Sequence, residues 1–167
     1  MEYHYKIDKN DLSTAVTEFT TPFDPDFKAC VLETQSVGNT LIAFFKDQVQ
    51  PGNYGVAILL KGFNQRYRII STQFRASNYS SVVGIFSFKI KNKPYYAVGG
   101  YNLSGDIYFY GLDYSAYINP GYLSRDRTTQ SLQFQVENPQ FLEIYPADEL
   151  DERIVNESEE ILHNYHF

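Results

Sequence analysis

The sequence predicts an α+β fold that is mainly antiparallel β, with a curved meander sheet, a weak N-terminal helix and a C-terminal acidic helix. Short apolar runs alternate with turn signals from residue 29 onward, which is typical of antiparallel strands joined by tight loops. Phe and Tyr make up 17% of the chain, and both fit half-buried strand positions. A partly closed β-barrel is the alternative arrangement of the same strands.

A chain of 167 residues fits a single domain, because about 100–200 residues usually bury one core. We expect three parts within this domain of residues 1–167. Residues 1–28 are irregular with a short helix, residues 29–145 form the meander, and residues 146–166 form the terminal helix.

The N-terminal helix is weakly encoded. Asn10 or Asp11 would cap it. Three threonines between positions 14 and 20 disfavour a helix, and Pro22 ends it. Its apolar positions would be Leu12, Ala15, Val16 and Phe19.

Three hairpins account for the next seventy residues. They join 29–37 to 40–46 through Gly38-Asn39, 55–60 to 66–74 through 61–65, and 81–90 to 95–99 through 91–94. The continuous apolar run 55–60 predicts a central strand buried on both faces. In the third hairpin, Phe86, Phe88 and Ile90 would share one face, while Ser87, Lys89 and Lys91 share the other.

The remaining elements follow in order. We expect a strand at 106–111 that pairs with 95–99, a long loop at 113–129, and a last strand pair at 131–136 and 140–145. A helix would begin at Pro146, where acidic residues crowd the first turn and suit the helix dipole.

Residue types needed for several chemistries are scarce. The three histidines, His4, His163 and His166, all lie near the termini, and Cys30 is alone. We therefore expect no catalytic residue, no metal and no cofactor, and no disulfide within the chain. Asp106 and Asp113 flank a Tyr-rich run, so a carboxylate and Tyr hydrolase acting on carbohydrate is an alternative to a binding function.

Charge is segregated along the chain. The net charge of −6 belongs to residues 146–167, which hold seven acidic residues and one basic, whereas residues 1–145 hold 13 of each sign. No acidic residue lies between Asp47 and Asp106, a stretch that carries seven cations. Within it, Arg66 and Arg68 would share a strand face, as would Lys89 and Lys91.

These cations suggest a binding surface. The candidate ligand-binding residues are Arg66, Arg68, Lys89, Lys91, Tyr95, Tyr96, Tyr108 and Tyr110, with the tyrosines as stacking platforms. Our main interpretation is a non-enzymatic binding or interaction domain whose partner is a protein or an anionic polymer. An anion-binding module for wall polymer or, less favoured, nucleic acid is a further alternative. The acidic terminal helix would compete for the same patch if it docks there, and plain solvated surface is the simplest explanation of the cations.

Residues 29–114 resemble a group of bacterial proteins. The segments 31–47, 54–57, 61–71, 97–102 and 110–114 are similar to uncharacterised extracytoplasmic domains of bacterial membrane-anchored proteins. The resemblance implies the outward-facing part of an envelope protein, and hence an extracytoplasmic location in preference to a cytoplasmic one. No apolar run in the sequence reaches the roughly 18 residues that a spanning helix needs, so we expect no integral membrane segment in this chain.

Overall fold

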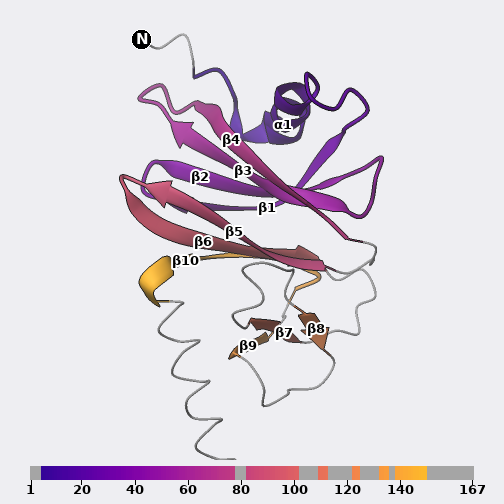
Figure 1. Cartoon of the computed structure of the whole chain (residues 1–167). Coiled ribbons are helices and arrows are strands. Elements are labelled where there is room, and N and C mark those ends of the chain that lie inside the picture. Colours follow the sequence, from indigo (N-terminus) through magenta and orange to yellow (C-terminus); the bar gives the residue numbers. More distant parts are fainter. Residues whose placement is uncertain are drawn as a thin grey trace, which may run out of the picture. The chain divides into compact units, whose positions relative to one another are not determined.

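The structure is a computed structural model that describes residues 5–77, 82–101, 109–112, 122–124, 132–135 and 138–149. It has two compact units, an N-terminal unit (Met1–Tyr79) and a C-terminal unit (Ser80–Phe167), which we describe separately (Figure 1). Antiparallel strands dominate both, and a short helix lies near the N-terminus, so the predicted mainly antiparallel α+β class is confirmed. The single domain stays a prediction.

The N-terminal unit is a four-stranded antiparallel meander with one α-helix. Its elements are the 3-10 helix η2 (Lys9–Asp11), α1 (Leu12–Thr20), β1 (Ala29–Val37), β2 (Thr40–Asp47), β3 (Asn53–Lys61) and β4 (Tyr67–Ala76). The strand order is β1-β2-β3-β4, which matches the first two predicted hairpins. Gly38 has a φ of 59° at the first position of its two-residue turn, where a type II′ turn requires a positive φ.

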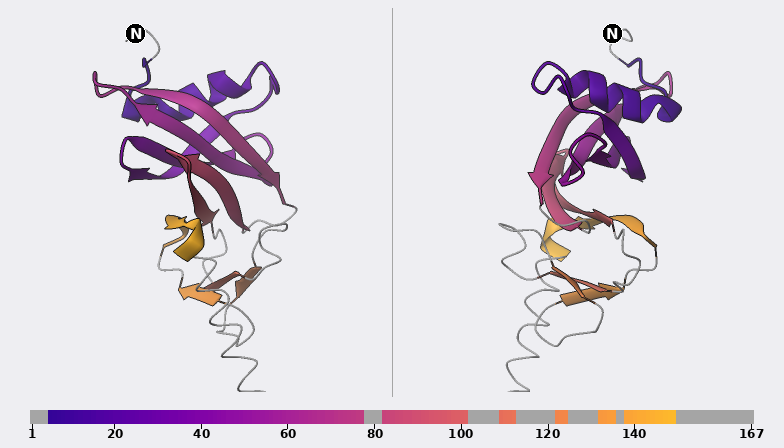
Figure 2. Two further views of the ribbon diagram at one scale, coloured as in Figure 1. Left: turned by 60° about the vertical axis from the view of Figure 1, so that its left-hand side comes forward. Right: turned by 90° about the vertical axis from the view of Figure 1, so that its right-hand side faces the viewer.

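Figure 2 shows α1 lying against one face of the β1–β4 sheet, and the buried apolar core of this unit includes residues of both. Leu12 and Val16 of α1 pack in one cluster with Leu59 of β3. Burying such a side chain stabilises the fold by about 1.5–3 kcal/mol. Residues 54–59 of β3 are buried on both faces, so the predicted central strand is confirmed.

The start and the stripe of α1 differ from the prediction. Asp11 holds the N-cap position of α1, as expected, but its side chain makes no capping hydrogen bond. The side chain of Asp8 instead caps η2 by accepting from Asn10 N. Thr20 is buried and Phe19 is exposed, because the contact with the sheet follows the spacing 12, 16 and 20.

Two hydroxyls of α1 fasten the helix to the edge strand β1. Ser13 Oγ accepts from Val31 N at 3.0 Å, and Thr17 Oγ1 accepts from Ala29 N at 2.9 Å. Residues four apart on a helix are separated by about 6 Å along its axis. Residues two apart on a strand are separated by a similar distance. Hydroxyl residues that weaken an isolated helix here satisfy two amides of an edge strand, which within the described residues has no second strand to accept from them.

Among its described residues, the C-terminal unit holds two three-stranded sheets. Its strands are β5 (Val82–Ile90), β6 (Lys93–Tyr101), β7 (Phe109–Leu112), β8 (Tyr122–Ser124), β9 (Leu132–Gln135) and β10 (Gln140–Pro146), in the orders β10-β6-β5 and β8-β7-β9. The third predicted hairpin is present, with a turn of only two residues, Lys91-Asn92. Both have positive φ, 48° and 67°, which is the pattern of a type I′ turn. Pro94 lies within β6, beyond the end of its pairing with β10 at Tyr95, so its missing N–H interrupts no bond of that ladder.

Two expected pairings and one expected loop in this unit are wrong. β6 pairs with β10 rather than with the strand at 109–112, and β9 pairs with β7 rather than with β10. β8 also lies inside the expected loop 113–129. A longer strand can form more backbone hydrogen bonds with β6, and this explains the observed partner. β10 pairs with β6 from Gln140↔Tyr101 to Pro146↔Tyr95, whereas β7 has only four residues. One continuous meander is therefore not formed, and the strands of the described ranges close no barrel.

The predicted acidic helix lies mostly outside the described residues. Residues 147–149 are helical directly after Pro146, and Asp148 and Glu149 are exposed. Residues 150–166 of that helix stay a prediction. Within the ranges that the structure covers, no helix combines the length and the apolarity needed to cross a bilayer.

Candidate functional site

The predicted cations fall into two separate sets. Arg66 directly precedes β4 and Arg68 is its second residue, and both are exposed in the N-terminal unit. Lys89 on β5 and Lys91 in the following turn are exposed in the C-terminal unit. These two pairs of cations belong to different units of the chain, and whether they form one patch stays a prediction. The predicted alternation on β5 is confirmed, since Phe88 is buried while Lys89 is exposed.

The predicted tyrosines are not equivalent. Tyr96 is half-buried and lies opposite Ser87 in the sheet register, so it shares the face of Lys89. Tyr95 lies on the other face, where its ring stacks on Phe88 with centroids 5.8 Å apart. Tyr108 lies outside the described residues, as does the side chain of Tyr110 on β7.

The carboxylates expected for the alternative carbohydrate hydrolase lie outside the part of the chain that the structure describes. Asp106 and Asp113 both lie outside the described residues. Burial raises the pKa of the Tyr101 phenol, so this tyrosine stays protonated at neutral pH and is poorly suited to act as a base. No group of three or more His, Cys, Asp or Glu residues that would suit a metal ion occurs in the part of the chain that the structure describes.

The clearest feature of the N-terminal unit is the tip of the β3–β4 hairpin. Phe63 is fully exposed there, in a turn that begins after Lys61 and ends at Arg66. Gly62 N donates to Arg66 O at 2.8 Å, which closes the turn. We call Lys61, Phe63, Arg66 and Arg68 the tip cluster.

The N-terminal segment braces this tip. Ile7 and Tyr67 exchange two backbone hydrogen bonds of 3.0 and 2.9 Å. Asn64 Nδ2 donates to Tyr5 O, and Asn64 Oδ1 accepts from Arg66 N. A Cβ added at Gly62 would lie 2.8 Å from the Tyr5 ring, so glycine is what allows this close packing. These contacts hold the tip in one conformation.

The electrostatics of the tip are cationic. The Arg68 guanidinium carbon lies 5.2 Å from the centroid of the Tyr5 ring, a cation–π contact that orients its charge. Lys6 and Asp8, which lie on either side of Ile7 in the bracing segment, are both exposed. Sequence reasoning found Arg66 and Arg68 from their alternation but missed Phe63. The available signal was its place between Gly62 and Asn64, a turn in which a large apolar side chain has no core to enter.

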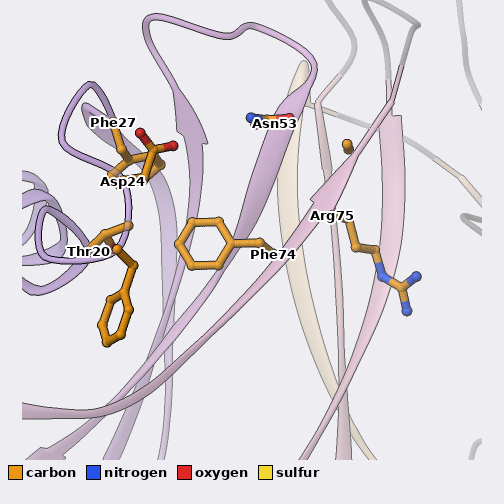
Figure 3. A pocket seen from close by; sticks show the side chains of 8 residues that line it. Thr20, Asp24, Phe27, Asn53, Phe74 and Arg75 are labelled. Atoms are coloured by element: carbon orange, nitrogen blue, oxygen red, sulfur yellow. The ribbon is translucent and has the colours of Figure 1, made fainter.

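A pocket of about 400 Å³ lies at the opposite end of the same hairpin (Figure 3). It is lined by Thr20, Phe23, Asp24, Phe27, Asn53, Phe74, Arg75 and Ala76. The Phe74 ring meets that of Phe27 edge to face, with centroids 5.4 Å apart. Figure 3 shows the Phe74 ring directed toward Thr20 and the Arg75 side chain directed away from the other labelled residues. Sequence reasoning missed this pocket, because its residues come from three separate stretches of the chain.

Comparisons with known proteins return no relative. The chain matches no protein-family model, no curated protein and no solved structure. The resemblance of residues 29–114 to extracytoplasmic domains therefore stays a prediction, and the function has to be inferred from the geometry above.

Proposed function

We propose that this chain is a non-enzymatic binding domain whose tip cluster docks on the anionic head-group surface of a lipid bilayer. The observation that carries the proposal is a fully exposed Phe63 at a braced hairpin apex with Arg66 and Arg68 beside it. An aromatic side chain at the interface and cations at phosphate depth are the combination that surface-bound segments use.

The shape of the tip favours a bilayer over a protein partner. A stable protein interface covers about 800 Å² on each side, more than one hairpin turn supplies. A bilayer needs only an apolar side chain to enter and cations to stay at its surface. Each cation near an anionic leaflet contributes about 1 kcal/mol, and burial of the Phe63 ring contributes about 1.5–3 kcal/mol. Binding of this strength is reversible.

The outward-facing envelope location belongs to the same proposal. A domain tethered beside a bilayer works at high local membrane concentration, so even a weak tip contact would orient it. The tether would supply proximity and the tip cluster would supply orientation.

Sedimentation with lipid vesicles tests the proposal. We expect binding to vesicles of phosphatidylglycerol and phosphatidylcholine, little binding to phosphatidylcholine alone, and loss of binding as salt is raised. The Arg66→Gln and Arg68→Gln double variant should bind about thirtyfold more weakly, because two surface cations that contribute about 1 kcal/mol each are lost. Equal binding to both vesicle types, or an unaffected double variant, would contradict the proposal.

An anionic polymer is a second candidate partner, supported by the C-terminal unit. Lys89 and Tyr96 share one sheet face there, and Lys91 and Lys93 are exposed nearby in the turn and strand start. This site would be revealed by retention on heparin that falls with Lys89→Gln and Lys91→Gln but not with Phe63→Ala. Retention that is absent at physiological salt would argue against it.

A further inference from the structure

We propose that the pocket beside α1 binds a small organic cation with an aromatic body, such as an arylalkylammonium ion. This second site is independent of the tip cluster and lies at the other end of the β3–β4 hairpin (Figure 3). Three features of the pocket carry the inference: aromatic walls, a buried hydroxyl without a partner, and an acidic rim.

The walls are aromatic and partly uncovered. Phe27 is buried and held edge-on by Phe45 and Phe74, at centroid distances of 5.7 and 5.4 Å. In contrast, Phe23 is 84% exposed and Phe74 is 44% exposed. The cavity of about 400 Å³ is at the small end of the range of ligand sites, which suits one ring with a short side chain. A ring placed there would cover the apolar area that these two phenylalanines leave in water.

Thr20 supplies the hydrogen-bonding group. It is only 5% exposed, and its Oγ1 has no hydrogen-bond partner within the part of the chain that the structure describes. Two neighbouring threonines behave otherwise, since Thr17 Oγ1 donates to Ser13 O and Thr21 Oγ1 donates to Thr17 O, both at 2.8 Å. The orphan hydroxyl is therefore specific to the threonine that lines the pocket. The Thr20 side chain has to turn its Oγ1, which is now closed to water, toward the pocket for a ligand N–H to satisfy it, and a buried polar group gains most from such a bond.

The charged residues that line the pocket favour a cationic ligand. Asp24 lines the pocket and is only partly buried, and one of its oxygens accepts from Asp26 N at 3.2 Å. Asn53 is engaged with Gln50, to which its Nδ2 donates at 2.8 Å. The Arg75 side chain is directed away in Figure 3. Of the charged lining residues, the carboxylate is thus left to meet the ligand, and it favours a cation over an anion.

The test is an NMR titration of ¹⁵N-labelled protein with three matched probes. Phenethylammonium carries a positive charge, 2-phenylethanol is neutral, and phenylpropionate is negative. We expect phenethylammonium to bind most tightly and to shift amides in the 20–27 and 74–76 segments. Tighter binding of the neutral or anionic probe, or shifts confined to other segments, would overturn the proposal.

Two substitutions separate a binding role from a structural one. Thr20→Val keeps the shape and removes the orphan hydroxyl, so it should leave thermal stability equal or higher while lowering phenethylammonium affinity about threefold to tenfold. Asp24→Asn should lower that affinity about tenfold and bring the charged and neutral probes close together. Unchanged affinity in both variants would contradict the proposal.

Two controls complete the design. Ile70 is 45% exposed on the same strand as Phe74 and does not line the pocket, so Ile70→Ala should leave probe affinity unchanged. Phe63→Ala should also leave it unchanged, because Phe63 belongs to the tip cluster. A loss of affinity in either variant as large as that in Asp24→Asn would contradict a site between α1 and the end of β4.

Discussion

The two ends of the β3–β4 hairpin present phenylalanine to water in opposite electrostatic settings. At the tip, Phe63 stands between cations, whereas at the open end Phe23 stands next to Asp24. β3 has nine residues, which separates the ends by about 30 Å. Our two proposals assign the same type of side chain to an anionic partner at one end and to a cationic ligand at the other, according to the neighbouring charges.

The two ends also differ in what holds them. The tip depends on hydrogen bonds among Tyr5, Asn64 and Arg66 and on the close packing at Gly62. The open end depends on edge contacts among Phe27, Phe45 and Phe74. Substitutions that remove packing should therefore damage the pocket, and those that remove hydrogen bonds should loosen the tip.

The largest effect is expected from Phe45→Ala. Phe45 is fully buried, and its ring contacts both Phe27 and Phe74 behind the pocket. The variant should lose about 3–5 kcal/mol of unfolding free energy, measured by denaturant titration. A loss below about 1 kcal/mol would show that aromatic packing does not support the open end.

A smaller effect is expected where α1 meets the edge strand. Thr17→Val leaves the amide of Ala29 without its acceptor, and the unfolding free energy should fall by about 1–3 kcal/mol. Hydrogen exchange at Ala29 should accelerate, while exchange at the tip should not change. The matched control is Thr14→Val at an exposed position of the same helix, for which we expect a change within about 0.5 kcal/mol.

Asn64→Ala should act on the tip alone. The amide of Arg66 loses its acceptor and Tyr5 loses a donor, so the unfolding free energy should fall by about 0.5–1.5 kcal/mol. Exchange at Arg66 should accelerate, and vesicle binding should weaken although the charge is unchanged. Unaltered vesicle binding would mean that the bracing of the tip has no part in docking.

Local patterns predicted most of the N-terminal unit. Its hairpins follow from adjacent runs and a glycine turn at Gly38, and the burial of β3 follows from a continuous apolar run. The pairing of β6 with β10 has no local signal. There, the ring of Phe141 lies over Gly100, where an added Cβ would come within 2.5 Å of the ring's Cζ atom. Such a fit depends on two positions forty residues apart, and periodicity within one segment does not reveal it.

The candidate sites divide in the same way. Arg66 and Arg68 were found because alternation along one strand predicts exposure, and the structure places both at the surface. Thr20 and Phe74 were not found, because only the docking of α1 beside the end of β4 makes them neighbours. A residue whose role depends on a tertiary contact has no distinctive pattern in the sequence around it.

A matched pair of phenylalanine variants tests the central claim most directly. Phe63→Ala and Phe23→Ala each remove one exposed ring from the same unit and should change the unfolding free energy by no more than about 0.5 kcal/mol. With phosphatidylglycerol-containing vesicles at low salt, we expect Phe63→Ala to lower the partition coefficient about tenfold or more and Phe23→Ala to leave it unchanged. An equal loss in both variants, or none in Phe63→Ala, would contradict the assignment of the cationic tip as the docking site.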